Sequence, residues 1–426
     1  MAISIGDSFI SGEGGRFAGN IYDSRESDKA QDKGPHNKGN NSYVDAWGGH
    51  DFKETYTHDS EHEYIDGNQE CHRSDSAEIQ STKKAFGWTP VNLACSGATS
   101  SDILKDWYHD EEPQVKQLAK LANDPKYDIK AVVVSIGGND VGFSDLMSKL
   151  VQITDTNSPE DQSWKNKLNP FVKKKNIWEE YAENISEVSA KITTTLNTIT
   201  DTMRSAGYED DTYRFVYQSY TNLFAGSNNR YMAVDSKSQL KRLESPGVPL
   251  SNYTVDYSRS TMVPALSAMT REGWWVAKNK NIQFMNVTNA FEGHELSSKS
   301  TEQILAKQNK VPNPATAEWV VPINSNFIVG SIAKTSRHFE SFHPNRFGQE
   351  AYGTCLVATI KSISRQMHCT GQADKPPSEI KTQTGSCGTI RGSFNMSLPA
   401  SHELLGYYVP RISLAEFLTL GIVRRV

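Results

Sequence analysis

Four short segments of the chain carry residue types that acyl transfer requires. Residues 3–14 read Ile-Ser-Ile-Gly-Asp-Ser-Phe-Ile-Ser-Gly-Glu-Gly, an apolar run that ends at glycine and Ser8. Residues 91–99 (Val-Asn-Leu-Ala-Cys-Ser-Gly-Ala-Thr) and 131–140 (Ala-Val-Val-Val-Ser-Ile-Gly-Gly-Asn-Asp) also lead to glycine, and residues 340–346 read Glu-Ser-Phe-His-Pro-Asn-Arg. Acyl transfer needs a hydroxyl nucleophile, a base, a group that orients the base, and donors for an oxyanion. Ser8 offers the hydroxyl, and His343 offers an imidazole whose usual pKa suits proton transfer near neutrality.

The elements that position these residues follow from the hydrophobic pattern. Buried parallel strands read as β-branched apolar runs, and five candidates lie at residues 2–7, 90–95, 130–136, 213–219 and 282–287. Helical patterns lie at residues 112–123, 177–206, 260–279 and 347–367. This alternation predicts a three-layer α/β/α, flavodoxin-like fold around a parallel sheet of about five strands. Because ligands bind at the carboxyl ends of such strands, we expect the four loops to converge on one crevice.

The four segments, in this order, resemble the four blocks of the SGNH (GDSL) hydrolase family over residues 3 to about 368. The resemblance implies that Ser8 is the nucleophile and His343 the base. Glu340 is expected to orient His343, although the family usually has Asp there and a backbone carbonyl is the alternative. By the same analogy, the oxyanion hole comprises the Ser8 N–H, the Gly97 N–H and the Asn139 amide.

The cysteines carry a second, narrower resemblance. Cys71-His72-Arg73-Ser74 precedes Cys95, as in the branch of the family that includes secreted actinobacterial lipases and esterases. That branch implies a Cys71–Cys95 disulfide. For the other three cysteines we favour a Cys355–Cys369 pair, with Cys369–Cys387 as the alternative.

Disulfides indicate an oxidising compartment, so a secreted protein is expected. The chain enters its first strand directly, and we expect that a signal peptide has been removed.

Charge and composition exclude some partners and leave two regions without a role. A net charge of −5 argues against nucleic acid, and no apolar run is long enough to span a membrane. We expect a monomer without metal or organic cofactor. A polar insertion at about residues 14–88 is expected to form a wall or lid over the crevice, with His58 and His62 in a solvated loop rather than a metal site. The hydrolase domain is predicted to span residues 1–368, followed by a small appendage at 369–426.

The sequence thus predicts a serine esterase or lipase that cleaves carboxylic esters through an acyl-Ser8 intermediate. Its substrate is expected to be a small-molecule, lipid or acetylated-carbohydrate ester. The polar insertion with its aromatic residues, among them Tyr43 and Trp47, would equally suit a carbohydrate O-acetyl esterase. A catalytically weak carbohydrate-binding protein on a hydrolase scaffold is the alternative from another functional class. Asp7 and Asp140 are expected to be structural carboxylates.

Overall fold

The computed structural model has a main compact unit and describes only part of the chain. The described residues are 1–15, 17, 46–47, 71–143, 177–231, 252–302, 312–321 and 340–385. The main unit spans Met1–Gly385, and a second unit, Ser386–Val426, lies wholly outside the described residues. The predicted lid, apart from residues 14, 15, 17, 46–47 and 71–88, also lies outside them, as do Cys387 and His58.

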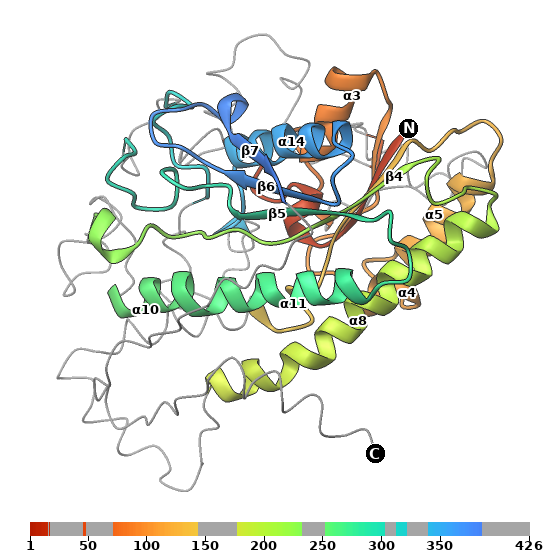
Figure 1. Cartoon of the computed structure of the whole chain (residues 1–426), viewed down its shortest axis with the longest axis horizontal. Helices are drawn as coiled ribbons and strands as arrows, with labels where there is room; N and C mark the ends of the chain where they lie inside the picture. The colour runs from red at the N-terminus through yellow and green to blue at the C-terminus, as the bar shows by residue number, and fades with distance from the viewer. Residues whose placement is uncertain are drawn as a thin grey trace, which may run out of the picture. The chain divides into compact units, whose positions relative to one another are not determined.

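A seven-stranded sheet forms the centre of the main unit, in the order β2-β1-β3-β4-β5-β6-β7. Figure 1 shows β4, β5, β6 and β7 of this sheet. The strands are β1 (Ala2–Gly6), β2 (Pro90–Asn92), β3 (Ala131–Ser135), β4 (Arg214–Gln218), β5 (Gln283–Asn289), β6 (Gln366–Thr370) and β7 (Lys381–Thr384). All neighbouring strands pair in parallel except β6 and β7, which are antiparallel. The central strands β1 and β3 are buried along their whole length, as their β-branched sequences predict.

The sheet is larger than the five predicted strands. All five predicted segments form strands, but β6 and β7 extend the sheet. Their sequences, Gln-Met-His-Cys-Thr and Lys-Thr-Gln-Thr, have no apolar run, and β7 is an exposed edge strand. Pairing of β6 with β5 and of β7 with β6, rather than hydrophobic patterning, therefore defines these strands.

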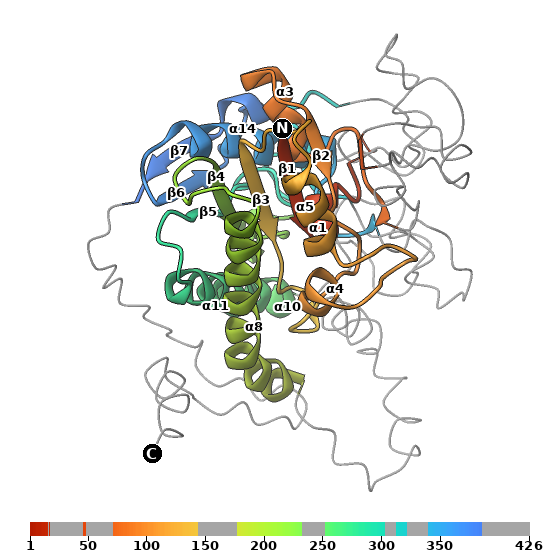
Figure 2. The same ribbon diagram turned by 90° about the vertical axis from the view of Figure 1, so that its right-hand side faces the viewer.

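Helices cover both faces of the sheet, which confirms the three-layer architecture. The longer helices are α5 (Gln114–Asn123), α8 (Ile177–Ser205), α11 (Val263–Val276) and α14 (Arg346–Lys361). The short elements are α1 (Ser8–Ser11), η3 (Glu78–Gln80), α3 (Ser81–Phe86), α4 (Ser100–Leu104), η4 (Ser227–Asn229), α10 (Asn252–Tyr257), η5 (Ser258–Met262) and η6 (Pro377–Glu379). Figure 2 shows α14 and α3 on one side of the strands and α8 and α11 on the other.

Two predicted boundaries differ from the structure. The helix expected at 347–367 ends at Lys361, and β6 begins five residues later. The domain boundary expected at residue 368 falls inside β6, because the chain continues in the sheet through β7 and stays in the main unit to Gly385. A disulfide between Cys355 on α14 and Cys369 on β6 ties this part of the chain to the helical layer. It confirms the pairing that we favoured.

None of the helices in the described part of the chain combines the length and hydrophobicity of a membrane span.

Candidate active site

Ser8 lies where β1 turns sharply into α1. Gly6 has φ +145°, and a Cβ there would lie 1.9 Å from the carbonyl oxygen of Ser135 on β3, so only glycine permits this close approach. Asp7 caps α1 by accepting a hydrogen bond from the Phe9 N–H at 3.1 Å. Ser8 therefore begins a helix at the carboxyl end of a central strand, and its residue surface is only 7% exposed.

The imidazole of His343 faces the Ser8 hydroxyl. The distance between His343 Nε2 and Ser8 Oγ is 2.7 Å. On the other side of the ring, His343 Nδ1 lies 3.2 Å from the carbonyl oxygen of Ser341. Because a carbonyl only accepts, Nδ1 must carry the proton of the neutral ring. Nε2 is then free to accept the hydroxyl proton of Ser8, which is the arrangement that a general base needs.

A backbone carbonyl lies beside Nδ1 of His343 in this structure. Phe342 has φ +67°, a left-handed conformation that is uncommon for a bulky residue. This turn accompanies the approach of the Ser341 carbonyl to Nδ1. Glu340 is fully buried, and its own backbone carbonyl accepts a hydrogen bond from the His343 N–H at 3.2 Å. An orienting role for the Glu340 carboxylate stays a prediction.

The proposed oxyanion donors lie on loops that follow neighbouring strands. Gly97 has φ +81°, and a Cβ there would lie 2.4 Å from the Tyr108 hydroxyl oxygen. Asn139 Nδ2 donates to the Ala98 carbonyl at 3.0 Å, so the third sequence block is bonded to the second. Within the described part of the chain, neither the Ser8 N–H nor the Gly97 N–H donates to an acceptor.

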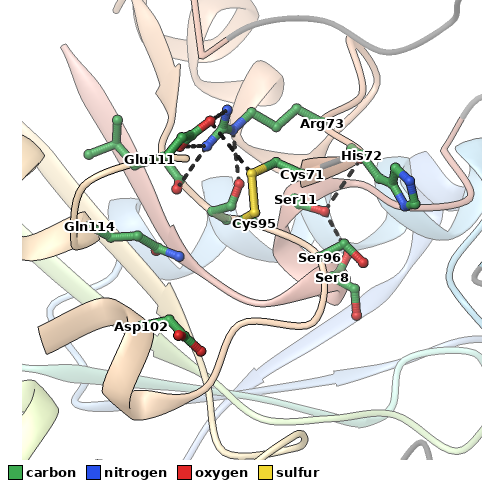
Figure 3. The surroundings of a disulfide bond; sticks show 12 residues. Ser8, Ser11, Cys71, His72, Arg73, Cys95, Ser96, Asp102, Glu111 and Gln114 are labelled. Carbon is green, nitrogen blue, oxygen red and sulfur yellow. Dashed lines mark hydrogen bonds and ion pairs between the residues drawn. A yellow bond between two sulfur atoms is a disulfide. The ribbon is translucent and has the colours of Figure 1, made fainter. Parts of the chain in front are cut away.

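A disulfide and a buried arginine fix the Gly97 loop (Figure 3). Cys71 and Cys95 are bonded, which confirms the predicted pair. Arg73 is buried, makes two hydrogen bonds to the Glu111 carboxylate at 2.7 and 2.6 Å, and donates to the Ala94 carbonyl at 2.9 Å. A bidentate arginine–carboxylate pair of this kind fixes the relative orientation of the two side chains and adds electrostatic attraction. The Cys-His-Arg-Ser segment thus anchors the strand end that precedes Gly97.

Tyr220, which the sequence analysis missed, connects two blocks of the site. Its hydroxyl donates to Asp7 and accepts a hydrogen bond from the Gly138 N–H at 2.9 Å. Burial raises the pKa of Asp7 to about 7, although the hydrogen bond from Tyr220 opposes that increase. Asp140 accepts hydrogen bonds from the Ser100 N–H and hydroxyl at 2.9 and 3.1 Å. Asp7 and Asp140 thus hold backbone around the site, as predicted.

Glu13 is a second residue that the sequence analysis missed. Its buried carboxylate accepts hydrogen bonds from His72 Nδ1 at 2.8 Å and from Ser96 Oγ at 2.5 Å. One of its oxygens, Oε2, also lies 3.7 Å from His343 Nε2. In the sequence, Glu13 lies in a Gly-Glu-Gly segment after Ser8 that is typical of an ordinary turn. Only the structure shows that this turn lies beside His343.

In the residues that the structure describes, no group of three or more His, Cys, Asp or Glu side chains is placed to hold a metal ion.

Comparison with known proteins gave matches among solved structures only. No family model and no curated protein sequence matches the chain. One similar solved structure is an extracellular lipase from Streptomyces rimosus, with 16% identity, a TM-score of 0.42, and coverage of 85% of this chain and 99% of that chain. Another is phospholipase A1 from Streptomyces albidoflavus NA297, with 17% identity, a TM-score of 0.39, and coverage of 85% and 98%.

Proposed function

We propose that this protein is a serine hydrolase of the SGNH type, an esterase or lipase that cleaves carboxylic esters through an acyl-Ser8 intermediate. The observation that carries the proposal is the 2.7 Å contact between Ser8 Oγ and His343 Nε2, with Nδ1 held by a carbonyl. Ser8 attacks the ester carbonyl carbon while its proton moves to Nε2. The proton then passes to the leaving alkoxide, and water attacks the acyl-enzyme by the same route.

Three donors support the tetrahedral intermediates in this proposal. The Ser8 and Gly97 N–H groups have no other acceptor among the described residues. The Asn139 side chain donates one hydrogen to the Ala98 carbonyl, which fixes the direction of the amide, and a primary amide carries two donor hydrogens. Loss of one such donor costs about 3 kcal/mol of transition-state stabilisation. We therefore expect Asn139→Ala to lower kcat by a factor on the order of 100.

An exposed tryptophan next to a residue that contacts Gly97 supports an apolar or ring-shaped substrate. Trp107 is 62% exposed and precedes Tyr108, whose hydroxyl lies against Gly97. An exposed indole offers a flat face to an acyl chain or a sugar ring. Two disulfides in the described chain support the proposal that the enzyme is secreted.

The test is a substrate panel that compares the wild type with Ser8→Ala. p-Nitrophenyl esters from acetate to palmitate, together with acetylated polysaccharides, separate esterase, lipase and carbohydrate-esterase activity. We expect turnover of at least one ester class and a loss of more than about a thousandfold in Ser8→Ala. If Ser8→Ala retained more than about a hundredth of the wild-type rate, the assignment of the nucleophile would be wrong.

A further inference from the structure

The buried Glu13 carboxylate lies at the centre of the site, yet the mechanism above does not use it. It contacts three groups from different segments: His72 beside the disulfide, Ser96 next to Gly97, and His343. Figure 3 shows His72, Ser96 and Ser8 close to one another at this edge of the sheet. A charge in such a position acts on its neighbours with little screening by solvent.

The backbone around Glu13 is built to place this side chain. Gly12 and Gly14 both have positive φ values, +91° and +83°. A Cβ on Gly14 would lie 2.9 Å from the Pro344 carbonyl oxygen and 3.2 Å from His343 Cβ, so this turn packs directly against the histidine loop. Two glycines that permit a close approach therefore flank the carboxylate.

The Glu13 side chain carries a negative charge despite its burial. Burial alone would raise the pKa of Glu13, but the nearby His343 and the hydrogen bonds from His72 and Ser96 outweigh it and lower the pKa. Ordinary esterase triads place a carboxylate on the Nδ1 side of the histidine. Here a neutral carbonyl, that of Ser341, occupies the Nδ1 side.

We propose that Glu13 is a positioning residue that supplies the negative charge for the His343 imidazolium from the Nε2 side of the ring. The inference rests on the proposed function. As Ser8 Oγ attacks the ester carbonyl carbon, its proton moves to Nε2 and the ring becomes positive, 3.7 Å from Glu13 Oε2. The carboxylate takes up no proton; it favours the charged ring until Nε2–H is donated to the leaving oxygen. Its bond to Ser96 also holds the loop that carries Gly97.

Other titratable groups share this environment and must be separated from His343. His72 faces Glu13 directly, and Asp7 lies close enough that the charge on Glu13 contributes to its raised pKa. Asp140 acts on Asp7 in the same way. Glu340 precedes His343 by three residues. A change in pH dependence is therefore assigned to His343 only if it persists when His72 cannot titrate.

The experiment measures the pH dependence of kcat and KM for p-nitrophenyl acetate, and of the rate at which a fluorophosphonate labels Ser8. Glu13→Gln keeps the shape and an acceptor oxygen for Ser96 but removes the charge. We expect kcat to fall by about 30- to 100-fold, with KM within about threefold. We also expect the acid midpoint of the profile to move to lower pH by about one unit, because the protonated ring loses its counter-charge.

Three matched variants separate charge from architecture. Ser96→Ala keeps the carboxylate and removes only the loop contact, so its acid midpoint stays within about 0.2 units of the wild type. In a His72→Gln background, the shift caused by Glu13→Gln must persist. Should Glu13→Gln fail to fold, as judged by urea unfolding, Glu13→Asp carries the test. It keeps the charge and must keep the midpoint, and a midpoint lowered by about one unit would contradict the inference.

Failure of the inference is distinguishable from failure of the proposed function. If the wild type labels at Ser8 and folded Glu13→Gln labels at a similar rate with the same midpoint, Glu13 has no such role. If the wild type neither labels nor hydrolyses esters, the proposed function itself is wrong, and the inference falls with it.

Discussion

Replacement of Tyr220 by phenylalanine removes one hydroxyl that joins the nucleophile block to the Asn139 block. Tyr220 follows β4 and lies 213 residues from Asp7 in the sequence. Its hydroxyl oxygen accepts from the Gly138 N–H, and its hydrogen goes to Asp7. Phenylalanine fills the same volume, so the substitution isolates these two hydrogen bonds.

The expected loss of stability follows from the two groups that lose their hydrogen-bond partner, the Asp7 carboxylate and the Gly138 N–H. Asp7 and Tyr220 are both buried, and the hydrogen bonds to Asp7 and Gly138 form inside the protein. A buried polar group without a partner costs about 1–3 kcal/mol. We therefore expect Tyr220→Phe to lower the free energy of unfolding by about 3 kcal/mol near neutral pH. Because Gly138 precedes Asn139, we also expect kcat to fall by a factor of about 10 to 100.

The raised pKa of Asp7 also predicts how the free energy of unfolding changes with pH. The pKa of Asp7 rises from 3.8 to about 7 on folding, so the folded state holds a proton that the unfolded state has released. The free energy of unfolding therefore falls as pH rises through this window, by about 1.4 kcal/mol per unit for one proton. The Tyr220 hydrogen bond lowers the pKa of Asp7. In Tyr220→Phe the free energy of unfolding must therefore continue to fall above pH 7. The difference in this free energy between the variant and the wild type must be larger at about pH 8 than at about pH 6.

Tyr217→Phe is the matched control for this experiment. Tyr217 is also buried, and among the described residues its hydroxyl donates to the Ile136 carbonyl alone, at 3.0 Å. Its loss should cost about 1 kcal/mol, with kcat within about threefold of the wild type. Urea unfolding at both pH values and ester kinetics measure both variants. If Tyr220→Phe behaved like Tyr217→Phe in stability and in kcat, the coupling of the two blocks through Tyr220 would be refuted.

Three further predictions concern the reacting pair, Glu340 and the disulfide. Ser8→Ala and His343→Ala should each reduce ester hydrolysis by more than about a thousandfold, and the double variant should be little worse than either single one because the two residues act as a unit; additive losses in kcat would contradict this. Since the Ser341 carbonyl faces Nδ1, Glu340→Gln should lower kcat by less than about tenfold. A loss of about ten-thousandfold, as seen when the carboxylate that orients a catalytic histidine is replaced by an amide, would assign the orienting role to Glu340. Replacing Cys71 and Cys95 by serine should lower the free energy of unfolding by about 3 kcal/mol and also reduce kcat through the Gly97 loop, and unchanged urea midpoints and kinetics would disprove the role of this disulfide.

The sequence predicted those parts of the fold that hydrophobic pattern alone determines. The β-branched run at Ala131–Ser135 could be nothing other than a buried element, and it became a central strand. The edge strand Lys381–Thr384 could not be found, because a polar strand is specified by its neighbour rather than by its own residues.

In the candidate site, too, the sequence predicted some residues and missed others. Ser8 and His343 were predicted from short sequence blocks and the family resemblance that these blocks carry, and the structure places their side chains in contact. Glu13 and Tyr220 were missed because their roles depend on tertiary approach between distant segments. The approach of the Ser341 carbonyl to His343 Nδ1 could not be predicted from sequence either. It accompanies a positive φ at Phe342, which a bulky residue adopts only under tertiary constraint.

The central claim, that Ser8 is a nucleophile activated by His343, is tested most directly by covalent trapping. The wild type is treated with a fluorophosphonate probe at neutral pH, digested, and mapped by mass spectrometry, with His343→Ala in parallel. The account predicts one probe per chain, on the peptide that contains Ser8, and labelling slowed by more than about a thousandfold in His343→Ala. Labelling of another residue, or labelling of Ser8 at an equal rate without His343, would contradict it.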